Sequence, residues 1–308
     1  MRQDLQVPIK LEIPFIPESL WNPGPLGSLI RIVDPVHFDQ PALSLAPDRP
    51  QPIPTSFADR VRKGTVQLGF WSGQGCRIMA NTDNFSQPSR DLDWCFHAGV
   101  SQLLASQGAV FLHACAFLDT DPSGILVVGE SGAGKSTWAA LDLRQGLKVV
   151  SDDCVMATRM TDTPGVEIRS LRGFLNFRQP TPDLLPAELA ANLYPVRNTN
   201  PREYRLALAD HPQYSPVAMP DRLISCRVDR RLAQTRITAI PQPLLLAELI
   251  RASSSLFLSA RYPQERAGML PVLMALTRQM RGFRVRLGRD LFRDPDGTFQ
   301  RLIDSIAN

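Results

Sequence analysis

The feature that most constrains this chain is a glycine-rich segment between an apolar run and a helical pattern. Residues 129–136 read GESGAGKS and satisfy the pattern G-x-x-x-x-G-K-[ST] at every defined position. The preceding residues, 125–128, form a short apolar run typical of a buried strand. Residues 136–145 carry a helical pattern, which Gly146 is well placed to end. The order strand, loop, helix, strand predicts an α/β domain with a largely parallel core.

The residue types in this segment suit the binding of a nucleotide phosphate. Glycines let successive backbone N–H groups turn inward around a phosphate, and the helix that follows points its positive end at it. Lys135 supplies a point charge for the β- and γ-oxygens, and the Ser136 hydroxyl is a ligand for Mg²⁺. The sequence therefore predicts binding of ATP with Mg²⁺. The expected nucleotide contacts are Gly129, Glu130, Ser131, Gly132, Ala133, Gly134, Lys135, Ser136 and Thr137.

Two adjacent carboxylates follow the next apolar run, residues 147–150. Asp152 and Asp153 are expected at the end of that strand, on the ligand side of an α/β sheet. Neighbouring residues of a regular strand point opposite ways, so one carboxylate can face a metal while the other reaches an acceptor. A turn pair is the structural alternative, since Asp is common in turns. Two carboxylates with different tasks suit phosphoryl transfer to a hydroxyl, whereas a plain NTPase needs a group that positions water.

A single histidine, His113, falls in the middle of the apolar run 110–118. A lone histidine on an apolar strand is most often a hydrogen-bonded core residue. A strand antiparallel to, or beside, the strand of the phosphate loop would instead bring His113 to the phosphates. There it would tune Asp152 or contact the γ-phosphate.

Composition narrows the class of protein. A net charge of +4 over 308 residues gives no reason to expect nucleic acid as a partner. No apolar run reaches the roughly 18 residues of a membrane span, and the first residues do not resemble a signal peptide. The five cysteines are widely spaced with no C-x-x-C pair, which is typical of reduced thiols in a cytoplasmic protein.

Proline spacing divides the chain. Residues 1–90 are rich in proline and favour a mainly β region, with a strand expected at 66–70. Residues 91–308 hold the phosphate loop and form the second unit. Within it, the proline-rich residues 180–220 are expected to be a loop-rich excursion that contacts substrate or acts as a lid.

Further elements follow from apolar periodicity. Helices are expected at 91–107, 244–258 and 264–280, and a half-exposed strand at 282–287.

Arginines offer two further candidates. Arg202 and Arg205, in the excursion, are candidates for a residue that stabilises transferred charge. A basic stripe near the C-terminus favours a solvated face, with binding of an acidic peptide or a second phosphate as the alternative. Its members are Arg278, Arg281, Arg284, Arg286, Arg289 and Arg293.

Taken together, these residues resemble the HPr kinase/phosphorylase family, and more closely its HPr-kinase-related branch. The resemblance rests on His113, the loop 129–136, the Asp152–Asp153 pair and residues 167–173, with a smaller contribution from 92–95. It implies an α/β P-loop kinase core of the HPr kinase/phosphoenolpyruvate carboxykinase type. It also implies use of ATP and Mg²⁺, transfer to a serine or threonine hydroxyl of a peptide or small protein, and assembly into a homo-oligomer.

The resemblance also implies roles. By position, Asp152 corresponds to the general base, and Asp153 to the carboxylate that joins Ser136 at the metal. His113 corresponds to the active-site histidine. Arg169 and Arg172 correspond to a loop used in catalysis and substrate contact.

One departure bears on the substrate. Thr137 stands where HPr kinases carry glutamate, which removes a carboxylate from the metal neighbourhood and weighs against phosphorolysis and against HPr as acceptor. The related branch includes kinases that phosphorylate lasso-peptide precursors, so a biosynthetic precursor peptide is one form of peptide acceptor that the resemblance implies. A small-molecule hydroxyl kinase and an ATP-sensing module without phosphotransfer are the alternatives.

Overall fold

The computed structural model describes two parts of the chain. In the N-terminal part it describes the backbone of five strands, and the remainder of the description begins at residue 101. The described ranges after that are 101, 104–105, 108–119, 122–160, 164–171, 173–196, 203–208, 211–253 and 263–307. Of the helix expected at 91–107, residues 101, 104 and 105 are helical, and the others lie outside the described residues.

The N-terminal strands form one antiparallel sheet in the order β1-β2-β5-β4-β3. Strand β4 lies where residues 66–70 predict a strand. The bounds are β1 Lys10–Glu12, β2 Ala42–Ala46, β3 Asp59–Lys63, β4 Val66–Trp71 and β5 Gly75–Ala80.

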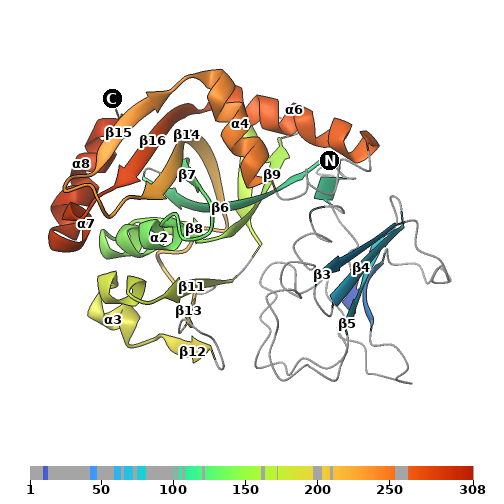
Figure 1. The fold of residues 1–308 in the computed structure, drawn as a ribbon, viewed down its shortest axis with the longest axis horizontal. Helices are drawn as coiled ribbons and strands as arrows, with labels where there is room; N and C mark the ends of the chain where they lie inside the picture. The colour runs from blue at the N-terminus through green and yellow to red at the C-terminus, as the bar shows by residue number, and fades with distance from the viewer. Residues whose placement is uncertain are drawn as a thin grey trace.

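The centre of the fold is an eight-stranded mixed sheet in the order β10-β9-β6-β7-β14-β16-β15, with β8 also paired to β6 (Figure 1). Strand β10 pairs with β14 as well, so the pairings of β6, β9, β10, β14 and β7 close a ring. The bounds are β6 Val110–Leu118, β7 Ser123–Val128, β8 Lys148–Ser151, β9 Cys154–Arg159, β10 Val166–Ser170, β14 Val217–Val228, β15 Arg236–Ile240 and β16 Arg281–Leu287.

The expectation of a largely parallel core is wrong. Strand β14 runs parallel to β7 and β16, whereas the other pairings among the described strands of this sheet are antiparallel. Strands β6 and β7 are joined by a short connection, which only an antiparallel pair allows. The chain then crosses through a helix, but β8 returns beside β6 instead of β7.

Helices cover both faces of this sheet, which explains why its central strands β6 and β7 are apolar without alternation. On β7, Ile125 and Val127 belong to the core beneath helix α2 (Lys135–Arg144). Leu126 and Val128 belong to the core beneath α4 (Gln242–Ala252) and α6 (Pro263–Gln279) (Figure 1). The helices expected at 244–258 and 264–280 are present as α4 and α6, and the strand expected at 282–287 is present as β16. Helix α4 ends at residue 252 rather than 258.

An aromatic cluster anchors α2. Trp138 is fully buried, stacks on Phe117 of β6 with ring centroids 6.0 Å apart, and meets Phe299 edge-on at 5.7 Å. Phe299 belongs to α8 (Pro295–Ala307), which follows the short helix α7 (Asp290–Arg293). Packed aromatic pairs contribute about 0.5–1.5 kcal/mol beyond their buried area, so this cluster holds α2 firmly on the sheet.

The proline-rich residues 180–220 contain more regular structure than expected. They include the 3₁₀ helix η4 (Thr181–Leu184), helix α3 (Ala187–Ala190) and strands β12 (Tyr194–Val196) and β13 (Glu203–Ala207). Strand β13 pairs with both β12 and β11 (Phe174–Arg178) in a small antiparallel sheet. Buried leucines of η4 and α3 join the core beneath α2. Pro180, Pro182 and Pro186 stand at helix starts, where a missing N–H costs little, and Pro220 lies in β14 next to a register shift.

Within the residues that the structure describes, none of the helices has both the length and the hydropathy needed to cross a membrane.

Candidate active site

The glycine-rich segment forms a tight loop between β7 and α2. Gly132 and Gly134 have φ angles of 81° and 103°, in the left-handed region that side-chain-bearing residues rarely adopt. Gly129 is required for space, since a Cβ there would lie 2.6 Å from the carbonyl oxygen of Cys226. The loop therefore depends on three of its glycines for two different reasons.

The first turn of α2 leaves its backbone N–H groups for a ligand. Gly134 caps the helix without a side chain, and the first turn contains no acidic residue. Such an end carries partial positive charge and favours an anion. Lys135 lies at the same place, 6% exposed, and its ammonium donates to the carbonyl oxygens of Gly129 at 2.9 Å and Glu130 at 3.3 Å.

A buried thiol ties the loop to the sheet. The Cys226 thiol donates to the Ala133 carbonyl oxygen at 3.1 Å and accepts from the Trp138 indole nitrogen at 3.2 Å. Burial raises the pKa of Cys226 to about 12, so the thiol stays neutral and retains its proton as a donor. Sequence reasoning treated the cysteines only as reduced thiols and missed this contact, because Cys226 is distant along the chain from both Ala133 and Trp138.

Asp152 lies beneath the start of α2. Its side chain is buried, and Oδ2 lies 3.5 Å from the Ser136 hydroxyl oxygen. The same oxygen accepts from the backbone N–H of Asn176 at 3.0 Å, and the Asn176 side-chain oxygen accepts from Arg205 Nε at 3.1 Å. Strands β11 and β13, which carry Asn176 and Arg205, thereby connect the excursion to the loop.

Asp153 points to a different partner, His113. The two side chains form an ion-pair contact between His113 Nε2 and Asp153 Oδ1, with exposed fractions of 38% and 27%. Strand pairing creates this contact, since His113 is in register with Cys154 and the Asp153 carbonyl accepts from Ala114 N–H at 2.8 Å. The expected arrangement, a histidine strand antiparallel to the strand of the loop, is confirmed. The carboxylate that His113 meets is Asp153 rather than Asp152.

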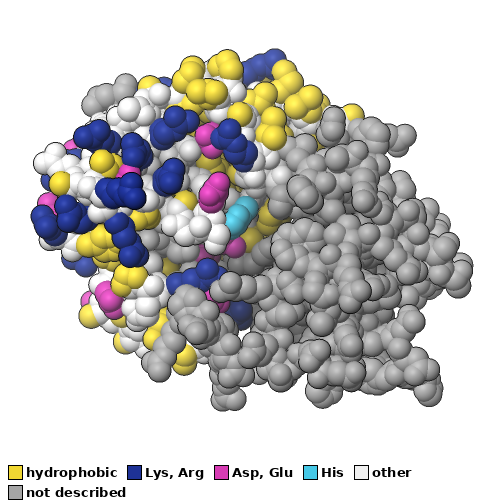
Figure 2. Space-filling model, viewed as in Figure 1, with side chains coloured by type: hydrophobic (Ala, Val, Ile, Leu, Met, Phe, Trp, Pro, Cys, Tyr) yellow, Lys and Arg dark blue, Asp and Glu magenta, His cyan; other side chains and the backbone are white. Residues whose placement is uncertain are grey.

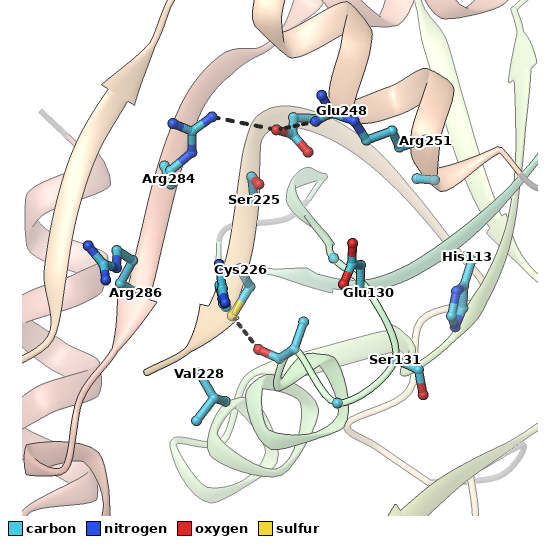
Figure 3. Close-up of a pocket in the computed structure, with 15 residues that line it drawn as sticks. His113, Glu130, Ser131, Ser225, Cys226, Val228, Glu248, Arg251, Arg284 and Arg286 are labelled. Atoms are coloured by element: carbon cyan, nitrogen blue, oxygen red, sulfur yellow. Dashed lines mark hydrogen bonds and ion pairs between the residues drawn. The ribbon is translucent and has the colours of Figure 1, made fainter. Parts of the chain in front are cut away.

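A cavity of about 810 Å³ opens above the loop (Figure 3). His113 lies at one side of it and Arg284 and Arg286 of β16 at the other, with Glu130 between them and Arg251 of α4 above. Its lining comprises His113, residues 129–133, Ser225, Cys226, Arg227, Val228, Glu248, Arg251, Ala252, Arg284 and Arg286. Lys135, Ser136, Asp152 and Asp153 are not among these lining residues, so His113 connects the acidic side of the loop to the cavity.

Of the expected arginines, Arg169 lies apart from this cavity and two others are outside the described residues. Arg169 lies in strand β10, not in a loop, and its Nε contacts Glu167 at 2.6 Å. It is exposed and does not line the cavity, because continuous pairing with β9 and β14 holds it in the sheet. Arg172 and Arg202 lie outside the described residues.

The oxygen donors of the site fit Mg²⁺. Ser136 and Asp152 offer a hydroxyl and a carboxylate side by side, and Mg²⁺ in phosphate-transfer sites typically takes one or two protein ligands with water and substrate oxygens. Larger clusters of ligating residues, of three or more His, Cys, Asp or Glu, are absent from the described part of the chain.

Comparison with known proteins found little. No family model matches the chain, and no curated protein matches it. A solved structure of the HPr(Ser) kinase/phosphatase from Coxiella burnetii matches with 16% sequence identity and a TM-score of 0.25, covering 49% of this chain and 98% of that one. The similarity to that structure is partial and distant.

Proposed function

We propose that this chain is an ATP- and Mg²⁺-dependent kinase that transfers the γ-phosphate to a serine or threonine hydroxyl of a peptide or small protein. The observation that carries the proposal is the separation of two neighbouring carboxylates, one against the loop serine and one against a histidine. A phosphotransferase needs both a metal-side carboxylate and a group that accepts the hydroxyl proton.

The contacts favour a division of tasks opposite to the one that the resemblance implies. Asp152, beside Ser136, suits the metal side. Asp153, partly exposed and paired with His113, suits the proton acceptor. In the reaction the acceptor oxygen bonds to the γ-phosphorus, the bond from that phosphorus to the β–γ bridging oxygen breaks, and ADP leaves with the bond's electrons. The acceptor's proton passes to the Asp153–His113 pair.

The loop and the cation supply charge stabilisation. When bound, Mg²⁺ neutralises the phosphate oxygens that gain charge during transfer. Lys135 and the first N–H groups of α2 hold the phosphates, the lysine exchanging the loop carbonyls it contacts for phosphate oxygens. Asn176 of β11 and Arg205 of the excursion position Asp152 from the other side.

The site argues against the two alternatives. An ATP-sensing module has no use for a histidine–carboxylate pair beside its phosphate loop. A small-molecule kinase usually encloses its acceptor, whereas His113 and the arginines line a cavity that reaches the protein surface, where they are 38–70% exposed. Figure 2 shows basic side chains gathered on this face.

Transfer from γ-labelled ATP tests the proposal. The full chain, Mg²⁺ and a panel of serine- and threonine-containing peptides should give labelled peptide, with free hydroxylated metabolites as the comparison. Asp153→Asn should lose transfer while keeping Mg²⁺-ATP affinity, and Asp152→Asn should weaken the Mg²⁺-dependent part of ATP binding. Label on metabolites alone would contradict the peptide acceptor. Tight ATP binding with no labelled acceptor would contradict the kinase function and favour an ATP-sensing module without phosphotransfer.

A further inference from the structure

Three arginines stand directly opposite one another across adjacent strands. Arg227 of β14 is in register with Arg286 of β16, which is in register with Arg236 of β15. All three side chains are exposed. We call these residues the arginine row. Like charges directly opposite each other destabilise a sheet. The arginine row therefore lowers the stability of the sheet, and packing within the sheet gives no reason for its presence.

The row leads from the edge of the sheet to the phosphate loop. Strand β15 is the last strand in the sheet order, β16 and β14 follow, and β14 pairs with β7, which ends at the loop. Arg227 and Arg286 also line the cavity that His113 borders (Figure 3). A ligand lying along the row therefore ends in the cavity, across from His113.

Positive charge exceeds negative charge on this wall. Arg251 and Arg284 share the carboxylate of Glu248, at 2.9 and 3.6 Å. Arg286 contacts the carboxylate of Asp229, and Arg227 lies close enough to help lower the pKa of that group. Four guanidinium groups thus face two carboxylates on this wall, and Glu130 of the loop adds a third at the cavity. The excess attracts an anion beyond the ATP phosphates, which the loop already holds.

The chemistry of the wall favours an acidic peptide over the nucleoside of ATP. An adenine site is typically an apolar slot, whereas this wall carries arginines, Glu248, Ser225 and small apolar residues, and the lining residues of the cavity include no Phe, Tyr or Trp. An acidic segment approaching bound ATP would be repelled by the phosphates, and a row of guanidinium groups offsets that repulsion.

We propose that the arginine row binds an acidic, extended segment of the acceptor and directs its serine or threonine toward His113 and Asp153. The proposal rests on the proposed kinase function and names its substrate class.

Binding of a labelled peptide tests it. The probe is a fluorescent peptide with a central serine flanked by glutamates, measured by anisotropy with the full chain at low salt, against the same peptide with glutamine in place of glutamate. The Arg227→Gln/Arg286→Gln variant should bind the acidic probe at least about tenfold more weakly, with a shallower salt dependence. The control, Arg278→Gln/Arg293→Gln, removes the same charge from exposed positions outside the cavity and should bind as the unaltered protein does.

The outcomes separate this proposal from the kinase function. Equal loss in both double variants would overturn the row as a site, since only overall charge would matter. Weaker Mg²⁺-ATP binding by the row variant, measured calorimetrically, with the acidic probe unaffected, would assign the row to the nucleotide and overturn the proposal. If the double variant does not fold, the single variant Arg236→Gln at the sheet edge should still lower the affinity for the acidic probe about threefold. An unchanged affinity in that variant would contradict the arginine row as a binding site. If the unaltered protein binds the probe but no ATP, the kinase function fails while the site stands.

Discussion

The imidazole of His113 and the carboxylate of Asp153 form an ion-pair contact at the border of the cavity above the phosphate loop. They come from different elements, the middle of β6 and the turn between β8 and β9. Asp152, one residue earlier, contacts Ser136 instead. A single peptide unit thus separates the carboxylate suited to the metal from the one suited to the proton.

Because His113 and Asp153 act as a pair, their substitutions should not be additive. His113→Gln and Asp153→Asn are each expected to lower the rate of phosphotransfer by about 10²–10⁴-fold, the range for a positioned acid–base group. The double variant should be little slower than the worse single one, as for other groups that act as a unit. Transfer rates at saturating ATP measure this. Losses that multiply would show that the two residues act independently.

Arg205 is expected to act through Asn176 on Asp152. Arg205→Gln should lower the rate of transfer about tenfold and raise the Mg²⁺ concentration needed for half-maximal activity, because Asp152 loses its orientation. Arg178→Gln is the matched control, since it lies on the adjoining strand in an exposed pair with Glu203. A Mg²⁺ titration of activity distinguishes the two, and identical curves for both variants and the unaltered protein would exclude the positioning role.

The loop glycines should respond differently to alanine. Gly129→Ala places a Cβ 2.6 Å from the Cys226 carbonyl oxygen, so backbone must move. It should cost about 1–3 kcal/mol of stability and abolish ATP binding. In Gly132→Ala the new Cβ lies in open space, so the substitution should cost only the backbone strain of a positive φ, about 1 kcal/mol of stability. Thermal unfolding and ATP titration report both effects. An intact ATP site in Gly129→Ala would disprove the packing argument.

Asp142 should make the protein less stable as pH rises. Its side chain is fully buried on α2, its carboxyl oxygens have no hydrogen-bond partner among the described residues, and burial raises its pKa well above the usual value. The folded state therefore keeps a proton that the unfolded state releases near pH 4, so stability falls from about pH 4 up to the raised pKa, by up to about 1.4 kcal/mol per pH unit.

Asp142→Asn removes that titration. Urea unfolding at pH 5 and pH 8 should show the variant gaining stability relative to the unaltered protein as pH rises. Asp296→Asn is the control of opposite sign, because a hydrogen bond from Arg144 lowers the pKa of that exposed carboxyl. Its contribution is small, is present above the unfolded pKa and is lost as pH falls. A pH dependence that Asp142→Asn leaves unchanged would refute the account.

The local sequence determined the glycine-rich loop and the elements around it. The apolar run, the glycines at fixed spacing and the helical pattern each act over a few residues, so β7, the loop and α2 form where the sequence predicts them. The same holds for β6 and for the position of the two aspartates after β8.

Tertiary structure decided which of these groups meet. The register of β6 against β9 brings His113 to Asp153, the pairing of β11 with β13 brings Arg205 to Asn176, and the register of β14, β16 and β15 aligns three arginines. Each contact joins residues far apart in the chain, and strand register is set by how apolar faces pack in three dimensions. The types of groups in this site are therefore readable from short segments, whereas their partners depend on the assembled sheet.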